Sequence, residues 1–435
     1  MIKEKDMKKK RELTKLKRKE SFLVKTVITL IALFFVQFGN VIPIPTINVT
    51  LFSYMIGKTD MLGMLNRFSG GSFSKMTFFA LGISIYISSS IIIQLLTVVF
   101  RKMEQYEQNG AYGKKQLEKI TIYFSIFMSV ISSLSFSLML RNYGMLKDYK
   151  MDTFLLTATL LCIGSLILIA LGKLIDEKGI GNGITMILMM NLITYIPNDA
   201  QIIYYSFIKG HTMKTRAATI AVITSLILLS IFLNEIEKRI HLQYSNAPIK
   251  NEAVDQTAYL SISCRLISVM PVILTSTIFQ VLSFVMLIIG KSKVAWYQYF
   301  NMANWFQKNS FKFTLGYLLY LALMVYFAYF YLSITFNAYQ MNQNFRKEGI
   351  TIDDKRPGTE TISFLKKSMN QVLWISIGIL FVIVTVPMAV TGLTNVSSFN
   401  MGGTTIIIII GAMLETIRSL KGEWLVQKYE KKKWL

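Results

Sequence analysis

The sequence predicts an all-α membrane protein with about ten transmembrane helices. Apolar residues make up 53% of its 435 positions and the mean hydropathy is +0.46, which is too apolar for an ordinary soluble domain. Apolar runs close to the ~20 residues that cross a ~30 Å hydrocarbon core recur along the chain, separated by charged or turn-rich segments. Helices satisfy their own backbone hydrogen bonds in lipid, and these runs are too long for barrel strands.

The expected spans follow one another between a basic arm, residues 1–21, and a basic tail, residues 421–435. Both cysteines, Cys162 and Cys264, lie in or beside apolar runs, so we expect reduced packing residues and no disulfide. The spans lie near residues 22–42, 76–100, 119–140, 153–173, 183–199, 215–234, 264–290, 312–335, 370–390 and 403–420.

Lysine and arginine are distributed unevenly between the two sides that these spans define. With a cytoplasmic amino terminus, the inside segments hold 32 of the 47 basic residues. This excess predicts a multi-pass protein of the cell membrane with both termini in the cytoplasm. A net charge of +23 is also typical of nucleic-acid binding. Basic arms beside spans attract anionic lipid at roughly 1 kcal/mol per residue, which is the simpler explanation; ribosomal RNA or an acidic protein is a secondary alternative.

A polar, glycine-containing segment, residues 64–74, separates the first two spans. Such a segment is tolerated at membrane depth only where protein or a water-filled cavity surrounds it, and an ordinary surface loop is the alternative. The next span carries Ser84 and the run Ser88-Ser89-Ser90, and a later span carries Thr275-Ser276-Thr277. Weak hydrogen bonds between such residues, worth ~0.6 kcal/mol, suit either ordinary helix packing or a seam that can open.

Two long loops, residues 235–262 and 336–369, are expected on the cytoplasmic side. The first carries Lys238, Arg239 and Lys250, and the second carries Lys355 and Arg356. Loops of this size between spans usually contact a partner, although a merely solvated loop is the alternative.

The sequence lacks the motifs of an enzyme. Gly179-Ile180-Gly181-Asn182-Gly183 has no lysine of a phosphate-binding loop, and no Gly-x-Ser-x-Gly elbow occurs. The two histidines, His211 and His241, have no metal-ligand spacing to cysteines or carboxylates. We therefore expect no catalysis, no cofactor and no metal. The apolar spans also lack paired carboxylates for coupling ions, which weakens the alternative of a secondary transporter.

A series of motifs resembles the SecY family in family order. The run Leu65-Asn66-Arg67-Phe68-Ser69-Gly70-Gly71, followed by Phe79-Ala80-Leu81-Gly82-Ile83, looks like the plug and second helix of that family. The resemblance covers about residues 22 to 430. Further matches are Ile42-Pro43-Ile44-Pro45, residues 176–183, residues 237–244, Met270-Pro271-Val272-Ile273, Arg356-Pro357-Gly358 and Gly402-Gly403-Thr404.

The resemblance implies two five-helix halves, residues 22–209 and 210–420, around a pore for unfolded polypeptide. A ring of branched apolar side chains would resist wetting at its neck. A plug over residues 61–75 would close it, and a lateral gate would open to lipid. The implied ring is Ile83, Ile87, Ile184, Leu188, Ile273 and Ile408; the plug includes Asn66, Arg67, Phe68, Ser69, Gly70 and Gly71; the gate includes Ser88, Ile91, Thr275, Ser276 and Thr277.

The resemblance also implies partners for the channel. A SecA-type ATPase or a ribosome would dock on the two loops through Lys238, Arg239, Lys250, Lys355 and Arg356. SecE-like small subunits, with or without SecG-like ones, or accessory Sec proteins and an unfolded preprotein complete the set, beside the anionic lipid expected from the basic arms.

Some residues depart from the family pattern. Ser84 and His241 stand where proline is usual, and Ser263 and Arg265 replace lysine and asparagine. These changes favour the accessory branch of Gram-positive bacteria, with its own accessory SecA and serine-rich glycoproteins as substrates. The housekeeping branch, with general secretion and membrane insertion, is the alternative.

Overall fold

The computed structural model describes residues 24–432 apart from 51, 53–65, 109, 149, 210–211, 245–258, 265–268, 289–298, 300–304, 307–310, 353–357 and 395–401. The chain divides into two compact units. Unit 1 comprises Met1–Asn198, Phe284–Ser292 and Ala412–Leu435, and unit 2 comprises Asp199–Ser283 and Lys293–Gly411. Each unit has its own hydrophobic core.

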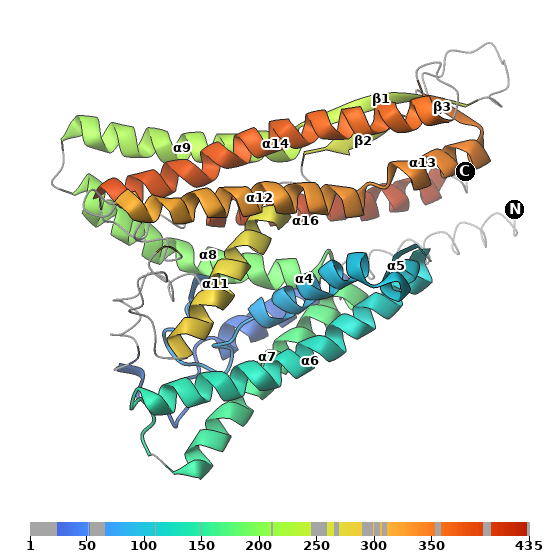
Figure 1. Cartoon of the computed structure of the whole chain (residues 1–435). Helices are drawn as coiled ribbons and strands as arrows, with labels where there is room; N and C mark the ends of the chain where they lie inside the picture. Colours follow the sequence, from blue (N-terminus) through green and yellow to red (C-terminus); the bar gives the residue numbers. More distant parts are fainter. Residues whose placement is uncertain are drawn as a thin grey trace, which may run out of the picture. The chain divides into compact units, whose positions relative to one another are not determined.

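Unit 1 is built mainly from helices, with a stretch of turns over residues 69–83. A helix over Val24–Gly39 is followed by α4 (Ser84–Val99), α5 (Arg101–Gln108), α6 (Gly110–Asn142), α7 (Met151–Lys178) and most of α8 (Gly183–Ile203). Helices α6 and α7 pack along each other (Figure 1). An aromatic group of Phe52, Phe73 and Phe136 lies at the centre of the core, with ring centroids 5.2–6.1 Å apart.

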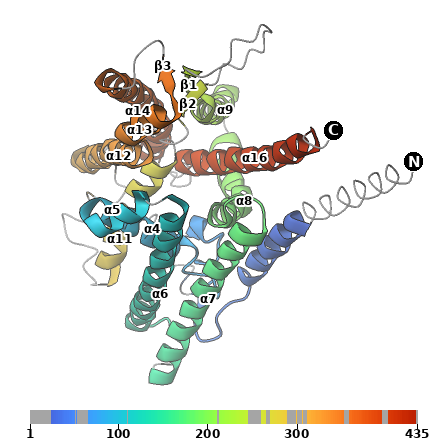
Figure 2. The ribbon, with the colours of Figure 1, turned by 90° about the vertical axis from the view of Figure 1, so that its right-hand side faces the viewer.

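Unit 2 combines helices with a small sheet. It contains the π-helix η1 (Tyr204–Ile208), α9 (Met213–Glu235), β1 (Glu237–Tyr244), β2 (Tyr259–Ser263) and most of α11 (Met270–Ile288). The short η4 (Phe311–Phe313), α12 (Thr314–Thr335), α13 (Ala338–Glu348), β3 (Ile350–Ile352), α14 (Thr359–Thr394) and the start of α16 (Gly402–Lys432) follow. Helix α14 packs against α9, α12 and α13. Figure 2 shows α12 and α13 beside α14.

The two long loops predicted from the sequence contain regular structure. A three-stranded antiparallel sheet has the order β2-β1-β3, with Ile240 opposite Leu260 and Leu242 opposite Ile352. Apolar residues alternate along its strands, and Ile240, Ile262 and Ile352 are buried against the core of unit 2. The all-α prediction is therefore corrected to a mostly helical fold with a small sheet. The two-residue alternation was the signal for these strands.

The second predicted span, 76–100, also differs from the structure. The helix begins only at Ser84, because residues 72–83 form successive turns in which Met76 and Gly82 have positive φ. Backbone groups of this segment bond to the chain after the first helix: Ile44 N donates to Met76 O (2.8 Å) and Phe78 N donates to Ile42 O (3.3 Å). The hydropathy of residues 76–83 could not predict these hydrogen bonds, because their partners lie in a distant part of the sequence.

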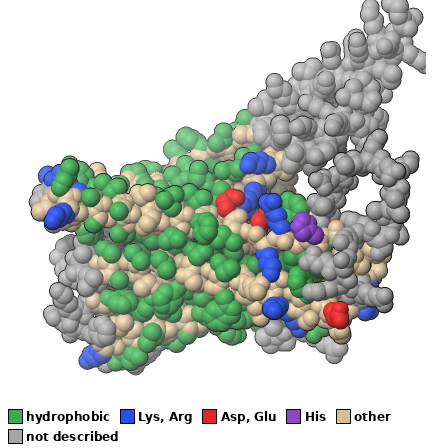
Figure 3. Space-filling model, turned by 90° about the horizontal axis from the view of Figure 1, so that it is seen from above, with side chains coloured by type: hydrophobic (Ala, Val, Ile, Leu, Met, Phe, Trp, Pro, Cys, Tyr) green, Lys and Arg blue, Asp and Glu red, His purple; other side chains and the backbone are tan. Residues whose placement is uncertain are grey.

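Six described helices are long and apolar enough to cross a membrane: Tyr112–Asn142, Met151–Lys178, Met213–Glu235, Thr314–Glu348, Thr359–Val390 and Gly403–Gly422. Three shorter apolar helices are Val24–Gly39, Ser84–Thr97 and Met270–Phe279. The prediction of about ten spans in two five-helix halves stays a prediction. In Figure 3, hydrophobic side chains cover much of one face, and charged side chains gather toward the end where β1 lies in Figure 1.

Candidate functional site

The segment that the sequence assigns to the plug folds into consecutive tight turns in unit 1. Of the predicted plug, residues 61–65 lie outside the described residues and residues 66–75 are described; residues 66–74 are called the plug segment. Gly70 and Gly71 both have positive φ, +67° and +85°, a backbone conformation that residues with a Cβ rarely adopt. Gly71 N donates to Asn66 O (2.7 Å), and Ser74 N donates to Asn66 Oδ1 (2.8 Å). These bonds fold the segment back on itself.

Two buried asparagines from different helices hold the plug segment in place. Asn191 of α8 donates from Nδ2 to the carbonyl of Phe68 (3.0 Å) and accepts from Asn40 Nδ2 (3.1 Å). Asn40, just after the first helix, accepts from Ser72 Oγ (2.6 Å). Asn40, Asn191 and Ser72 are all at most 4% exposed. We call these three residues the asparagine latch, because they link the plug segment to the first helix and to α8.

The only basic residue of the plug segment, Arg67, is also buried, at 5% exposure. Its guanidinium carbon lies 5.5 Å from the centroid of the Tyr195 ring, a cation–π geometry. The hydroxyl of the same tyrosine accepts from Asn66 Nδ2 (3.3 Å). Tyr195 therefore meets the plug segment with both its ring face and its hydroxyl.

The plug segment lies beside the unit 1 residues predicted for the pore ring. A Cβ placed on Gly82 would be 3.3 Å from Ser69 Cβ, and Gly82 directly precedes the ring candidate Ile83. On α8, Ile184 and Leu188 precede Asn191 and Tyr195 at intervals of four, three and four residues, which is the spacing of one helix face. Ile83, Ile184 and Leu188 are buried, and Ile87 is half-buried.

The remaining ring and gate candidates belong to unit 2, apart from Ser88 and Ile91 on α4. Ile273 lies in the first turns of α11 and Ile408 in α16, and both are buried. Among the gate hydroxyls, Thr275 donates to Pro271 O of its own helix (2.7 Å), and Ser276 shares a hydrogen bond with Tyr320 of α12 (3.1 Å). Thr277 is partly exposed. A common ring or gate formed by both units stays a prediction.

The docking candidates that the structure describes lie on β1. Lys238 Nζ donates to Gln371 Oε1 of α14 (2.6 Å). Arg239 is exposed and pairs with Glu237, and this hydrogen-bonded carboxylate raises the pKa of the Arg239 guanidinium. Lys250, Lys355 and Arg356 lie outside the described residues, as does the departure Arg265.

Sequence reasoning did not identify the residues that hold the plug segment. Asn40, Asn191 and Tyr195 lie in the predicted spans 22–42 and 183–199, but the sequence analysis gave them no role. An asparagine near the middle of a span is costly unless it is hydrogen-bonded, and that was the available signal. Among the described residues, no group of three or more His, Cys, Asp or Glu side chains could hold a metal ion.

The chain is similar in sequence to known translocase subunits. The family model of SecY matches residues 77–417. The chain is 28% identical over 416 residues to the protein translocase subunit SecY of Staphylococcus epidermidis, covering 93% of this chain and 95% of that protein. It is 28% identical over 407 residues to SecY of Pyropia yezoensis, covering 93% and 96%.

Two solved structures share the fold. One is described as the structure of a protein conducting channel, with a TM-score of 0.61, 16% identity and 92% of each chain covered. Another is Sec61 in the canine ribosome-channel complex from the endoplasmic reticulum, with a TM-score of 0.57, 15% identity and the same coverage.

Proposed function

The chain belongs to the SecY family of protein translocation channels, and from that premise we propose that it conducts unfolded preproteins across the cell membrane in an accessory Sec system. In this role it is the channel-forming subunit and hydrolyses nothing itself. The energy comes from a SecA-type ATPase, and the substrates are serine-rich glycoproteins.

The observation that carries this proposal is the seating of the plug segment. A glycine-containing segment is buried beside Ile83 by a small number of hydrogen bonds to the first helix and α8. Hydrogen bonds contribute a net ~1 kcal/mol each, so a few of them keep a segment in place without making its release prohibitive. A seat of this strength suits a plug that an entering polypeptide displaces.

The apolar ring candidates support the same role. Ile83, Ile87, Ile184, Leu188, Ile273 and Ile408 would line the neck of the pore when both units enclose it. Branched apolar side chains bar water and ions from a narrow neck without binding any particular passing side chain. The lateral gate to lipid would run between α4, with Ser88 and Ile91, and α11, with Thr275, Ser276 and Thr277.

The accessory role rests on the departures from the family pattern. His241 lies on β1, and Ser84 begins α4, where the family commonly has proline. A backbone N–H is available at both positions, whereas proline would remove it. Changes on the gate helix and on the surface proposed to face the motor favour a channel with its own motor. SecE-like and SecG-like subunits are the proposed membrane partners.

The ribosome is the alternative docking partner, since a related fold was solved in a ribosome-channel complex. The housekeeping role is the alternative pathway. Depletion of this protein from cells distinguishes the two roles, because general protein export should stop only if this chain is the housekeeping channel.

Site-specific crosslinking in membranes tests the proposal. Cysteine replaces Ile87 or Ile273 in a chain whose native Cys162 and Cys264 are serine, and a stalled export substrate carries single cysteines. The accessory and general SecA motors are supplied separately. Leu228→Cys on the exposed face of α9 is the matched control, because its side chain is 61% exposed and lies outside the proposed ring.

We expect substrate adducts at both ring positions, none at the control, and adducts only with the accessory motor. Adducts with the general motor would replace the accessory assignment by the housekeeping one. Absence of adducts with either motor, or equal adducts at the control, would contradict the pore assignment.

A further inference from the structure

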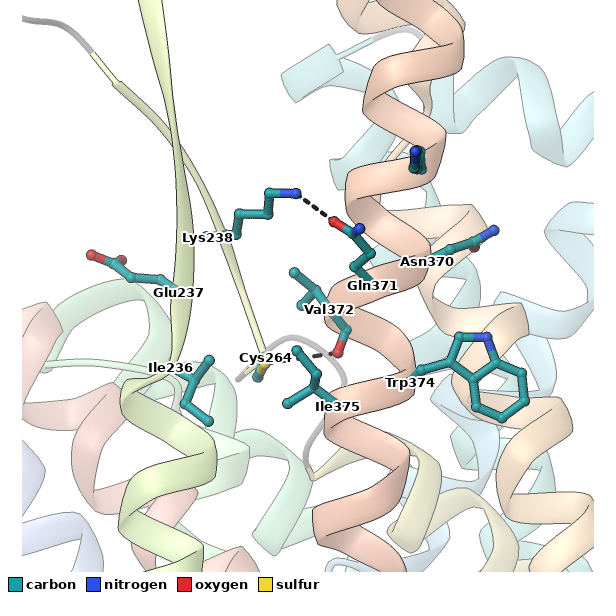
Figure 4. Close-up of a pocket in the computed structure, with 10 residues that line it drawn as sticks. Ile236, Glu237, Lys238, Cys264, Asn370, Gln371, Val372, Trp374 and Ile375 are labelled. Atoms are coloured by element: carbon teal, nitrogen blue, oxygen red, sulfur yellow. Dashed lines mark hydrogen bonds between the residues drawn. The ribbon is translucent and has the colours of Figure 1, made fainter.

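A pocket of 980 Å³ lies in unit 2, where the sheet meets α14. In Figure 4, Lys238 reaches toward Gln371, while Glu237 points away from α14. Ile375 lies toward Cys264 and Ile236 in the same view. The apolar part of the wall is Ile236, Cys264, Val372, Trp374 and Ile375, and the polar part is Glu237, Lys238, Lys367, Asn370 and Gln371.

The pocket carries positive charge that no described carboxylate neutralises. Lys238 donates to the neutral amide of Gln371 at 2.6 Å. Lys367 lies one helical turn before Gln371 on α14, so both side chains share a face of that helix. The single acidic residue of the wall, Glu237, already pairs with Arg239 at 2.5 Å. Among the described residues, neither Lys238 nor Lys367 forms an ion pair.

The apolar floor of the pocket adds no opposing charge. The Cys264 thiol is fully buried there. Its Sγ points to the carbonyl of Val372 at 3.8 Å. The electrostatic character of the pocket is therefore set by the two lysines.

The pocket also straddles the boundary between the apolar and polar parts of two spans. On α14, the exposed residues before position 372 are all polar or charged, and the last four of them are Lys366, Lys367, Asn370 and Gln371. From position 374 onward they are apolar, beginning with Trp374 at 58% and Ile375 at 50% exposure. On α9, the exposed apolar surface reaches Phe232 and the helix ends at Glu235. Tryptophan is enriched at membrane–water interfaces, which supports this placement of the boundary.

We propose that this pocket binds the headgroup of an anionic phospholipid, with its phosphate between Lys238 and Lys367 and an acyl chain along Trp374 and Ile375. Basic pockets between spans at the membrane surface are suited to such headgroups. A neutral lipid would offer no net charge for the lysines, and a soluble phosphate would leave the exposed apolar wall uncovered. The site depends on α9 and α14 spanning a membrane and not on the transport activity proposed above.

Native mass spectrometry of the purified full chain, with added phosphatidylglycerol or phosphatidylcholine, tests the site. The test variant is Lys238→Gln with Lys367→Gln. The control removes the same charge with Lys347→Gln and Lys366→Gln, two exposed lysines that do not line the pocket; Lys366 instead contacts Tyr339. Lys238→Arg with Lys367→Arg tests whether charge alone restores binding. Phosphatidylglycerol with a photoreactive acyl chain maps the contact.

Removing two lysines that each contribute about 1 kcal/mol should weaken phosphatidylglycerol binding roughly 30-fold. The control and the arginine variant should bind it like the native chain, phosphatidylcholine binding should not change, and labels should fall on the peptide with Trp374 and Ile375. The proposal is overturned by any of three results: equal phosphatidylglycerol binding in the test variant and control, equal binding of both lipids to the native chain, or occupation of the pocket by a co-purified membrane subunit. Unchanged melting temperatures confirm that the variants are folded.

Discussion

Replacing Asn191 by leucine should release the plug segment while leaving the rest of unit 1 folded. Asn191 makes three side-chain hydrogen bonds: it donates to Phe68 O at 3.0 Å and accepts from Asn40 Nδ2 at 3.1 Å and Gln37 Nε2 at 3.4 Å. Leucine is similarly branched and similar in size, so the change removes the bonds without opening a large cavity. The buried carbonyl of Phe68 and amide of Asn40 lose this partner.

The expected magnitude follows from these bonds. Only the bond to Phe68 O joins Asn191 to the plug segment, so at a net ~1 kcal/mol per hydrogen bond the seated state loses about 1 kcal/mol relative to the released state. This corresponds to an increase of roughly 5-fold in the ratio of released to seated plug. Buried groups left without a partner would increase the effect further.

Two assays measure the release. Ion leak through liposomes that contain the purified chain reports closure of the passage. Alkylation of Ser69→Cys by a water-soluble maleimide reports seating, because Ser69 is only 1% exposed when the segment is seated. Native Cys162 and Cys264 are replaced by serine in both the variant and its reference.

Thr194→Val is the matched control on the same helix. Thr194 is exposed and donates only to Met190 O of its own turn (2.9 Å), so its loss should leave both leak and alkylation unchanged. If Asn191→Leu behaves like this control, the asparagine latch does not hold the plug segment. A large fall in melting temperature in Asn191→Leu, without a rise in leak, would mean that Asn191 serves folding instead.

Two further predictions concern glycine and sheet positions. Gly70→Ala should raise the ion leak more than Gly349→Ala does. Both glycines have φ near +66°, a backbone conformation that costs alanine roughly 1–2 kcal/mol. Only at Gly70 would the added Cβ lie 2.9 Å from Asn191 Oδ1. Equal leak in both variants would show that the close contact of a Cβ at position 70 with Asn191 does not displace the plug segment. Ile262→Ala on β2 should lower the free energy of unfolding by about 2–5 kcal/mol, because the Ile262 side chain is fully buried. Tyr259→Ala at the end of the same strand should lower it by under about 1 kcal/mol, because the Tyr259 side chain is 51% exposed. Denaturant unfolding monitored for unit 2 checks this difference, and equal costs would contradict the register of the sheet.

The sequence predicted those parts of the fold that depend on long apolar periodicity. The spans near 119–140, 153–173, 215–234, 312–335, 370–390 and 403–420 each coincide with a helix that is long and apolar enough to cross a membrane. Length and hydropathy are local properties of the chain, so they can be read without tertiary information. The start of α4 at Ser84 could not be read in this way, because it depends on backbone bonds from the segment 72–83 to residues 42–44.

The candidate site was predictable only in its local part. The glycine turn at Gly70-Gly71 is visible in the sequence, and positive φ at both residues accounts for their identity. The partners of that turn are not visible, because Asn40 and Asn191 are separated by 151 residues and meet only after the helices pack. A buried asparagine in an apolar span needs a hydrogen-bond partner, but the sequence does not show which residue supplies it.

The plug segment is attached differently at its two ends, and this difference limits what can move. At its carboxyl end, Phe73 is 2% exposed and packs against Phe52 and Phe136, with apolar burial worth ~1.5–3 kcal/mol for such a side chain. The adjoining chain is bonded in place through Ile44 N to Met76 O. The part before Gly70 is held by polar contacts, from Phe68 O to Asn191 and from Asn66 to Tyr195, and by the buried Phe68 side chain. The part after Gly71 has in addition the ring contacts of Phe73 and the backbone bond at Met76, so residues 66–69 should leave first, turning about Gly70 and Gly71, while Phe73 stays in the core of unit 1.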